Sequence, residues 1–261
     1  MEQKRVNRKE IYTKTDEFLK EYFSSLLIII ILFSIANELL SLVLSLGIEG
    51  LSNLIAALSK GDIQSMQVIY LGASSSTVVA VCFALVAELV DVGIFIAILN
   101  AYRYGGKISF ETVINTFKAN YSKYLVAALA ITVISLLISL IPNVGGILNR
   151  IIRYGVAFSY FLIMDEKTEN GLSSLKDSYE LASGHLWNLF VMDMNYSLRI
   201  LVFTILIVIF TSLFVTPFNP MLGLIIDIAG LAVFVLKYLP AILTAKTIYY
   251  DEIQAIEEEN V

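Results

Sequence analysis

The chain contains a single histidine, His185, in the stretch GLSSLKDSYELASGHLWNLF at residues 171–190, which also holds the single tryptophan, Trp187. Histidine is the side chain best suited to proton transfer near neutral pH, so it is the first candidate for catalysis. The sequence has no second histidine for a metal site, no HExxH motif and no GxSxG motif. We therefore expect no catalytic residue, no metal and no cofactor, and we interpret the stretch as a helix anchored at a membrane interface, where an indole ring is favoured.

A second set of residues is ionisable and lies inside long apolar stretches. Its members are Glu38, Glu88, Asp91, Asp193, Asp227, Arg150, Arg153, Arg199 and Lys237. A charge at the centre of a membrane helix costs roughly 2.5 to 3.5 kcal/mol, so these charges require partners, a wet cavity or a nearby interface. At about 1.5 Å per residue, Glu38, Arg153 and Asp227 lie about 9 to 12 Å from the outer ends of their stretches. Arg150 is shallower and Glu88 is deeper.

Two arginines of this set stand three residues apart in GGILNRIIRYG, so they share one helix face, as a site for an anionic headgroup or carboxylate requires. The hypothetical ligand-binding site comprises Arg150, Arg153, Glu38, Glu88 and Asp227. The alternative is structural: the charges pair with one another, while Arg199 and Lys237 extend to the headgroups.

The elements that carry these residues are membrane spans. The chain is 57% hydrophobic and only 16% charged, with a mean hydropathy of +0.78, whereas soluble domains are about 25% charged. Its apolar runs reach the ~20 residues that a helix needs to cross a bilayer. Six spans are predicted, at residues 22–46, 77–101, 124–141, 147–164, 189–215 and 221–246. The single cysteine, Cys82, lies in the second of them and allows no internal disulfide.

The distribution of basic residues predicts the orientation of the spans. Twelve of the 18 Lys and Arg residues lie before the first span or in the even-numbered connections, and a thirteenth, Lys246, lies at the very end of the last span. One, Lys60, lies in an odd-numbered connection. Because positive charge is enriched on the cytoplasmic side, we expect both termini in the cytoplasm.

The connections predict three helical hairpins that form one membrane-embedded domain over residues 1–261. The short turns PNVGG at 142–146 and TPFNP at 216–220 make two hairpins tight, while residues 47–76 form a longer outer connection. Residues 109–123 and 172–186 have helical apolar periodicity, with Ser109 as a candidate N-cap. We expect them to be amphipathic helices at the cytoplasmic interface, and the segment EIYTKTDEFLKEYF before the first span is a third case.

Three stretches carry a family resemblance: GGKISFETVINTF, then YGVAFSYFLIMDEKTENGLSSLKDSYELASGHLWNLFVM, then YLPAILTAKTIYYDEI. The matching residues are Tyr154, Tyr160, Asp165, Ser178, Gly184, His185, Trp187, Pro240, Tyr249 and Tyr250. Over residues 95–253 the chain resembles an uncharacterised integral membrane family of Gram-positive bacteria, catalogued as domain of unknown function nine-seven-five. The resemblance implies a bacterial cell-membrane location. A more distant likeness to the membrane domain attached to some glycerophosphodiester phosphodiesterases implies work on lipids or the cell envelope.

These observations predict a non-enzymatic six-span protein that binds a lipid, amphiphile or peptide in transport, envelope maintenance or self-protection. Membrane lipids are the expected partners, and no nucleic acid is expected. The alternative is a scaffold or permease-like subunit that docks a separate cytoplasmic partner, such as an ATPase, through Lys176 and Glu180. An intramembrane hydrolase is the third hypothesis.

Overall fold

The computed structural model describes residues 6–60, 77–105, 108 and 110–259. Within its helices, the side chains of residues 36–52, 54–55, 58, 77–80, 82–83, 220 and 259 are not described. The described residues form helices joined by turns, with no strand among them, which confirms the predicted all-α class.

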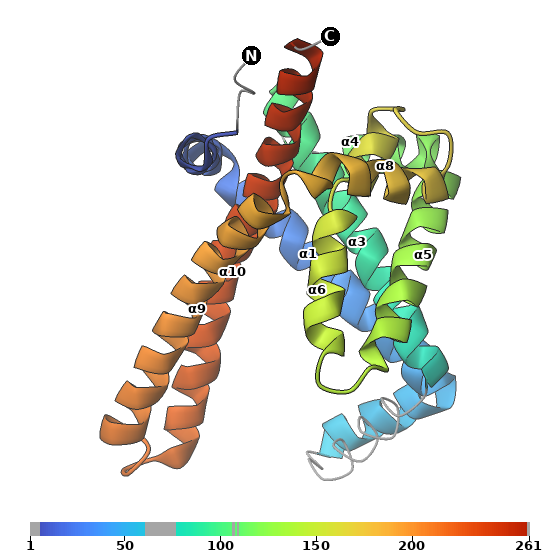
Figure 1. Ribbon diagram of the computed structural model, residues 1–261. Helices are drawn as coiled ribbons and strands as arrows, with labels where there is room; N and C mark the ends of the chain where they lie inside the picture. The colour runs from blue at the N-terminus through green and yellow to red at the C-terminus, as the bar shows by residue number, and fades with distance from the viewer. Residues whose placement is uncertain (1–5, 61–76, 106–107, 109, 260–261) are drawn as a thin grey trace. The chain divides into compact units, whose positions relative to one another are not determined.

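The helices follow one another along the chain as Figure 1 labels them. They are α1 (Arg8–Lys60), α3 (Thr77–Tyr104), α4 (Phe110–Ala119), α5 (Tyr121–Ser139), α6 (Gly145–Gly155), α7 (Ser159–Met164), α8 (Gly171–Ser183), α9 (Leu186–Phe214) and α10 (Pro220–Glu259). Six stretches of the described chain are long and apolar enough to cross a membrane: Arg8–Ile35, Ala84–Tyr104, Tyr121–Ser139, Gly145–Met164, Leu186–Phe214 and Met221–Glu258. The predicted number of spans is thereby confirmed.

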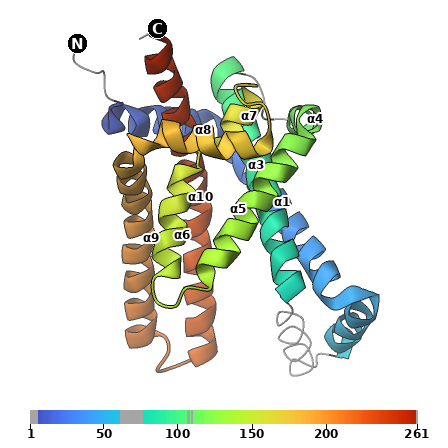
Figure 2. The same ribbon diagram turned by 45° about the vertical axis from the view of Figure 1, so that its right-hand side comes forward.

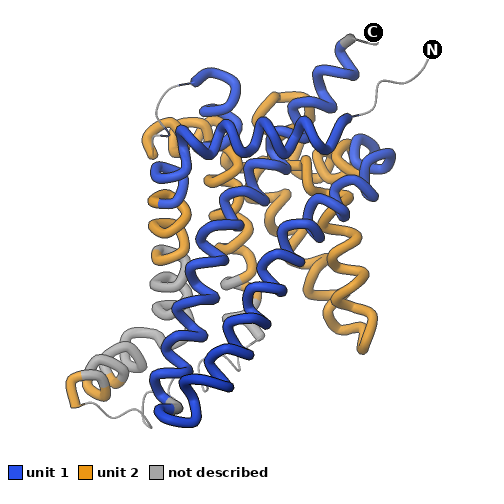
Figure 3. Tube along the Cα trace, turned by 90° about the vertical axis from the view of Figure 1, so that its left-hand side faces the viewer, with its two compact units in different colours: residues 1–27, 97–109, 180–261 blue, residues 28–96, 110–179 orange. Residues whose placement is uncertain are grey.

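The chain folds into two compact units, coloured separately in Figure 3. Unit 1 comprises residues 1–27, 97–109 and 180–261, and it contains the hairpin of α9 and α10. Unit 2 comprises residues 28–96 and 110–179, and its core is built from α3, α5 and α7. The buried residues of that core are Val92, Ile96, Tyr124, Ala127, Ile131, Tyr160 and Ile163.

The hairpin of unit 1 is apolar along its exposed surface. The helices α9 and α10 lie side by side in Figures 1 and 2 and are joined by residues 215–219. Its exposed large side chains are Trp187, Leu198, Leu201, Val202, Phe203, Ile205, Leu206, Val208, Ile209, Phe210, Leu213, Phe214, Phe218, Met221, Leu222, Leu224, Ile225, Ile228, Leu231, Val233 and Val235. A surface of this kind suits hydrocarbon rather than water.

The hairpin of unit 2 depends on a glycine. The α5 helix ends at Ser139, the turn includes Asn143 at a φ of 64°, and α6 starts at Gly145. A Cβ atom on Gly145 would lie 2.4 Å from the carbonyl oxygen of Ile138. Glycine therefore lets α6 begin directly against the end of α5.

The first span differs from the prediction. The segment before residue 22 is not a separate helix, because α1 is unbroken from Arg8 to Lys60. The chain has neither glycine nor proline between residues 8 and 46, so nothing ends the helix there. The predicted outer connection at 47–76 is helical through Lys60, and residues 61–76 and Ser109 lie outside the described part of the chain.

The fourth candidate span, Gly145–Met164, matches the predicted span at 147–164 in extent, but its helix is broken into α6 and α7. The Ser178 hydroxyl on α8 accepts a hydrogen bond from the Phe158 backbone N–H at 3.0 Å and donates one to the Gly155 carbonyl at 2.9 Å. An unsatisfied backbone group inside a membrane costs several kcal/mol. Ser178 therefore supplies the partners that the helix loses at the break.

The two predicted amphipathic segments are helices, α4 and α8. In α4, Val113 is buried. In α8 the buried face consists of small residues, Gly171, Ser174, Ser178 and Ala182. The large apolar side chains Leu172 and Tyr179 are 59% and 58% exposed.

Candidate functional site

The structure brings together two of the predicted site residues, Glu88 of α3 and Arg153 of α6, both in unit 2. The Arg153 guanidinium forms an ion pair with the Glu88 carboxylate, and the Tyr160 hydroxyl of α7 donates a hydrogen bond to the other carboxylate oxygen at 3.1 Å. The Glu88 side chain is 5% exposed and that of Arg153 is 45% exposed. The pair therefore compensates the charge of a buried carboxylate.

The other predicted residues have different surroundings. Arg150 is exposed on α6 and has no ion pair within the described part of unit 2. Asp227 belongs to unit 1, where the Thr211 hydroxyl donates a hydrogen bond to its carboxylate at 2.6 Å. The side chain of Glu38 is not described. On α8, Lys176 and Glu180 are both exposed.

Unit 1 contains a groove that the sequence did not single out. Three helices line it: α1, α9 and α10. The lining residues are Asp16, Leu19, Lys20, Phe23, Leu27, Tyr196, Arg199, Val233, Leu236, Lys237, Tyr238 and Ala241. Its volume is about 820 Å³, within the ~300–1,000 Å³ typical of small-molecule sites. We call it the cationic groove.

Three cations line this groove, one from each helix: Lys20 of α1, Arg199 of α9 and Lys237 of α10. None of the three has a carboxylate partner within ion-pair distance among the residues that the structure describes. The groove has one acidic residue, Asp16, so the formal charge of its lining is +2. Cations without protein partners favour a negatively charged ligand.

Short-range contacts orient two of these cations. The Arg199 Nε donates a hydrogen bond to the Asn195 side-chain oxygen at 3.1 Å, and its guanidinium lies 5.8 Å from the centre of the Tyr196 ring. The Lys237 ammonium lies 5.5 Å from the centre of the Tyr238 ring. Such cation–π contacts hold a charge without neutralising it.

The floor of the groove is aromatic and buried. Tyr196 is 5% exposed and Tyr238 is 9% exposed, and their ring centres are 6.4 Å apart. Tyr12 of α1 contacts Tyr196 edge-on at 5.8 Å. Packed rings of this kind give the groove a fixed shape.

The depth of the cations along the hairpin matches a membrane boundary. At 1.5 Å per residue, Arg199 lies about 22 Å from the end of α9 at Phe214, and Lys237 lies about 26 Å from the start of α10 at Pro220. A hydrocarbon core is about 30 Å thick. If the hairpin turn lies at one boundary, both side chains therefore reach the headgroups at the other.

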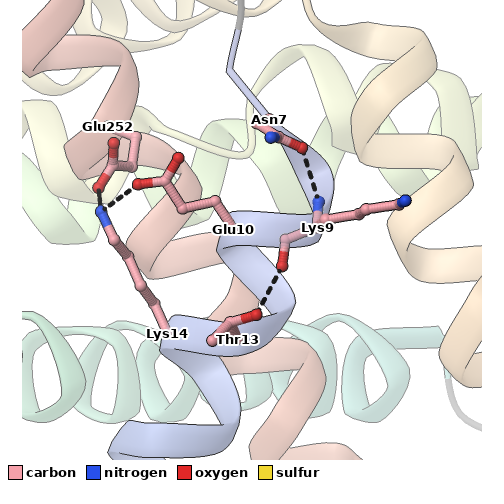
Figure 4. Close-up of polar contacts among 6 residues, drawn as sticks. All are labelled: Asn7, Lys9, Glu10, Thr13, Lys14 and Glu252. Carbon is pink, nitrogen blue, oxygen red and sulfur yellow. Dashed lines mark hydrogen bonds and ion pairs between the residues drawn. The ribbon is translucent and has the colours of Figure 1, made fainter.

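Ion pairs outside the groove fix the α1 wall within unit 1. The Lys14 ammonium pairs with Glu10 at 3.0 Å and with Glu252 of α10, as Figure 4 shows. The Arg103 Nε of α3 donates to the Asp251 carboxylate at 2.6 Å. The start of α1 and the end of α3 are thus tied to the last turns of α10.

His185 belongs to a hydrogen-bonded cluster in unit 1. Its Nδ1 lies 2.9 Å from the Tyr249 hydroxyl, which accepts a hydrogen bond from the Asn188 side-chain amide at 3.0 Å. The Tyr249 hydroxyl can donate its proton to the Nδ1 of a neutral imidazole. Burial lowers the pKa of His185 below its ordinary value.

The sequence contained one signal for the cationic groove. Arg199 lies 17 residues before Thr216 and Lys237 lies 17 residues after Pro220, on either side of the TPFNP turn. In a tight antiparallel hairpin, equal spacing places two residues at the same depth. Lys20 carries no such signal, because it lies far away in the sequence and only the fold brings α1 to the hairpin.

The fold and the groove together define an all-helical protein with six candidate membrane spans and a partly charged groove along an apolar hairpin. No protein-family model, curated protein or solved structure matches this chain.

Proposed function

We propose that the protein is a non-enzymatic integral membrane protein that binds an anionic amphiphile, in transport, envelope maintenance or self-protection. The observation that carries the proposal is the cationic groove, in which Lys20, Arg199 and Lys237 stand above apolar walls without carboxylate partners among the described residues. An amphiphile matches both parts of the groove, because its head carries negative charge and its tail is apolar.

The proposal includes an orientation. Both termini are cytoplasmic, because the basic residues are concentrated in the terminal segments and even-numbered connections. The family resemblance implies that the membrane is that of a bacterial cell. The turn between α9 and α10 then faces outwards. The groove cations lie at the inner boundary, where anionic lipids attract basic side chains.

Native mass spectrometry tests the proposal on protein extracted gently from its own membrane without overexpression. The wild type should retain an anionic amphiphile, and the double variant Arg199→Gln and Lys237→Gln should lose it. Lys118→Gln is the control for the loss of an exposed positive charge, because Lys118 of α4 is exposed and belongs to neither candidate site. Retention of the same amphiphile by the double variant would overturn the assignment to the groove.

A second arm tests the site predicted around Arg150 and Arg153. The triple variant Arg150→Gln, Arg153→Gln and Glu88→Gln removes both arginines without leaving the buried Glu88 carboxylate unpaired. Loss of the amphiphile in this variant alone would move the site to unit 2. A fall in thermal stability without ligand loss would assign these residues a structural role.

A scaffold function is the second candidate, and the exposed apolar residues Leu172 and Tyr179 of α8 favour it. They flank Lys176, so the helix presents both charge and apolar surface. Charge reversal at Lys176 and Glu180 should then abolish co-purification of a second polypeptide at fixed stoichiometry. Unchanged co-purification would exclude this helix as the docking element.

A further inference from the structure

Helix α8 contacts the break in the fourth candidate span, residues 156–158, which separates α6 from α7. The Ser178 hydroxyl bonds to both sides of this break, to the Gly155 carbonyl at 2.9 Å and to the Phe158 N–H at 3.0 Å. A Cβ atom on Gly155 would lie 2.8 Å from the Tyr179 ring, so α8 also packs directly on the last residue of α6. The position of α8 therefore determines whether the break keeps these hydrogen bonds.

The same break separates the two partners of the buried Glu88 carboxylate. Arg153, which forms the ion pair, lies near the end of α6. Tyr160, which donates the hydrogen bond at 3.1 Å, lies at the start of α7. The spacing and the angle between these two side chains depend on the geometry of the break. Helix α8 and Glu88 therefore stabilise the same broken arrangement, although they contact different parts of it.

The break has a regular alternative, which is an uninterrupted α-helix. In an α-helix each N–H bonds to the carbonyl four residues earlier. The Phe158 N–H would then bond to the Tyr154 carbonyl, and the Gly155 carbonyl would accept a bond from the Ser159 N–H. In the structure the Ser178 hydroxyl replaces both of these bonds, and the Ser159 N–H bonds to the carbonyl three residues earlier at 3.2 Å. If α8 moves away, the two helical bonds can form, so these backbone groups keep partners inside the membrane.

We propose that α8 is a regulatory helix that is coupled to Glu88 through the break. With α8 in place, the span is broken and Glu88 is bound by Arg153 and Tyr160. With α8 displaced, the span straightens and this arrangement is lost. A partner that binds the exposed face of α8, which includes Lys176, would shift the balance between the two forms. The residues of this device all belong to unit 2, so the inference goes beyond the proposed function and does not depend on the cationic groove.

Ser178→Ala tests the effect of α8 on Glu88. The variant lacks both bonds to the break, so the hydrogen bonds on the Glu88 carboxylate should change. Difference infrared spectroscopy on the full chain in lipid nanodiscs measures the carboxylate stretching band, which Glu88→Gln identifies by its loss. We expect this band to shift in Ser178→Ala. Ser174→Ala is the matched control, because Ser174 is also fully buried on α8 but its hydroxyl bonds to the Gly171 carbonyl of the same helix.

Glu88→Gln tests the reverse effect and leaves Ser178 in place. Coupling between two sites is reciprocal, so a change at Glu88 must be felt at α8. Hydrogen–deuterium exchange of residues 171–179 measures the local opening of this helix. Because loss of the ion pair favours the straight span, we expect exchange roughly fivefold or more faster than in the wild type, a usual coupling between sites. Asp227→Asn is the control, since it makes the same chemical change in unit 1 and should keep the wild-type rate.

Both responses are required. An unchanged Glu88 band in Ser178→Ala, or an equal shift in Ser174→Ala, would overturn the inference. Wild-type exchange of α8 in Glu88→Gln, or equally fast exchange in Asp227→Asn, would also overturn it. If Ser178→Ala does not fold, the exchange experiment decides alone. Neither measurement involves amphiphile binding, so failure of this inference and failure of the proposed function are distinguishable.

Discussion

Lys14 and Glu252 form an ion pair although they lie 238 positions apart in the chain, and Glu10 contacts the same ammonium group (Figure 4). The pair connects the second turn of α1 to the last turns of α10 within unit 1. Because α1 supplies Lys20 and the apolar residues of one groove wall, the ion pair contributes to the position of that wall.

Replacing Lys14 by methionine should lower the free energy of unfolding by about 0.5 to 1 kcal/mol, since the ion pair is partly exposed. The loss should shrink at high salt, which screens the wild-type pair. Thermal unfolding at low and high salt measures it. Lys9→Met is the control, because the Lys9 side chain is exposed and points away from Glu252 in Figure 4. Equal losses in both variants would show that the ion pair does not stabilise unit 1.

Glu88 and Arg153 should show strong coupling. Arg153→Met leaves a buried carboxylate without its cation and should cost about 2 to 3 kcal/mol, less than a fully buried pair because Arg153 is 45% exposed. Adding Glu88→Gln should recover most of the loss. A double-mutant cycle by thermal unfolding measures the coupling. Arg150→Gln, on the same helix, should change stability by less than about 0.5 kcal/mol. Additive effects of the two replacements would mean that the pair contributes nothing to stability.

The spans and hairpins could be predicted because their signals are local. The length of an apolar run shows directly whether a helix could cross a bilayer, and the turns PNVGG and TPFNP end one helix and start the next. The break between α6 and α7 could not be predicted, because it depends on the Ser178 hydroxyl, which lies about 20 residues further along the chain. The polar segment before residue 22 predicts a separate helix, whereas α1 continues through it from Arg8 to Lys60.

The candidate site was harder to predict, because apolar periodicity does not specify which charges meet. The sequence identifies Glu88, Arg153 and Asp227 as charges that need compensation. It does not predict that the Thr211 hydroxyl donates a hydrogen bond to Asp227, or that the Tyr160 hydroxyl donates one to Glu88. The cationic groove combines residues from three helices. Its detection required the tertiary arrangement of unit 1.

Gly145 and Gly146 provide a test of the α5–α6 turn at adjacent positions. Gly145→Ala would bring a methyl group to 2.4 Å from the Ile138 carbonyl oxygen, so the backbone must shift and stability should fall by about 1 to 3 kcal/mol. Gly146→Ala meets no atom within 4 Å and should be neutral or stabilising by up to about 1 kcal/mol, because alanine favours a helix. Thermal unfolding of both variants decides. If Gly145→Ala is as stable as Gly146→Ala, the close contact between the start of α6 and the Ile138 carbonyl at the end of α5 would be contradicted.

His185 should make stability depend on pH in a defined direction. Burial lowers its pKa in the folded protein, whereas in the unfolded chain it titrates near 6.5. As pH falls through this value, the unfolded chain binds a proton before the folded protein does, which favours the unfolded state. The contribution of neutral His185 to the free energy of unfolding is therefore full above about pH 6.5 and decreases below it. Protonation would also make Nδ1 a donor, and the Tyr249 hydroxyl proton would lose this acceptor. His185→Asn should therefore flatten the pH dependence of the melting temperature between about pH 5.5 and 7.5, while Lys9→Met keeps the wild-type slope. A wild-type melting temperature that rises on acidification through this range would contradict the assignment of a neutral, buried His185.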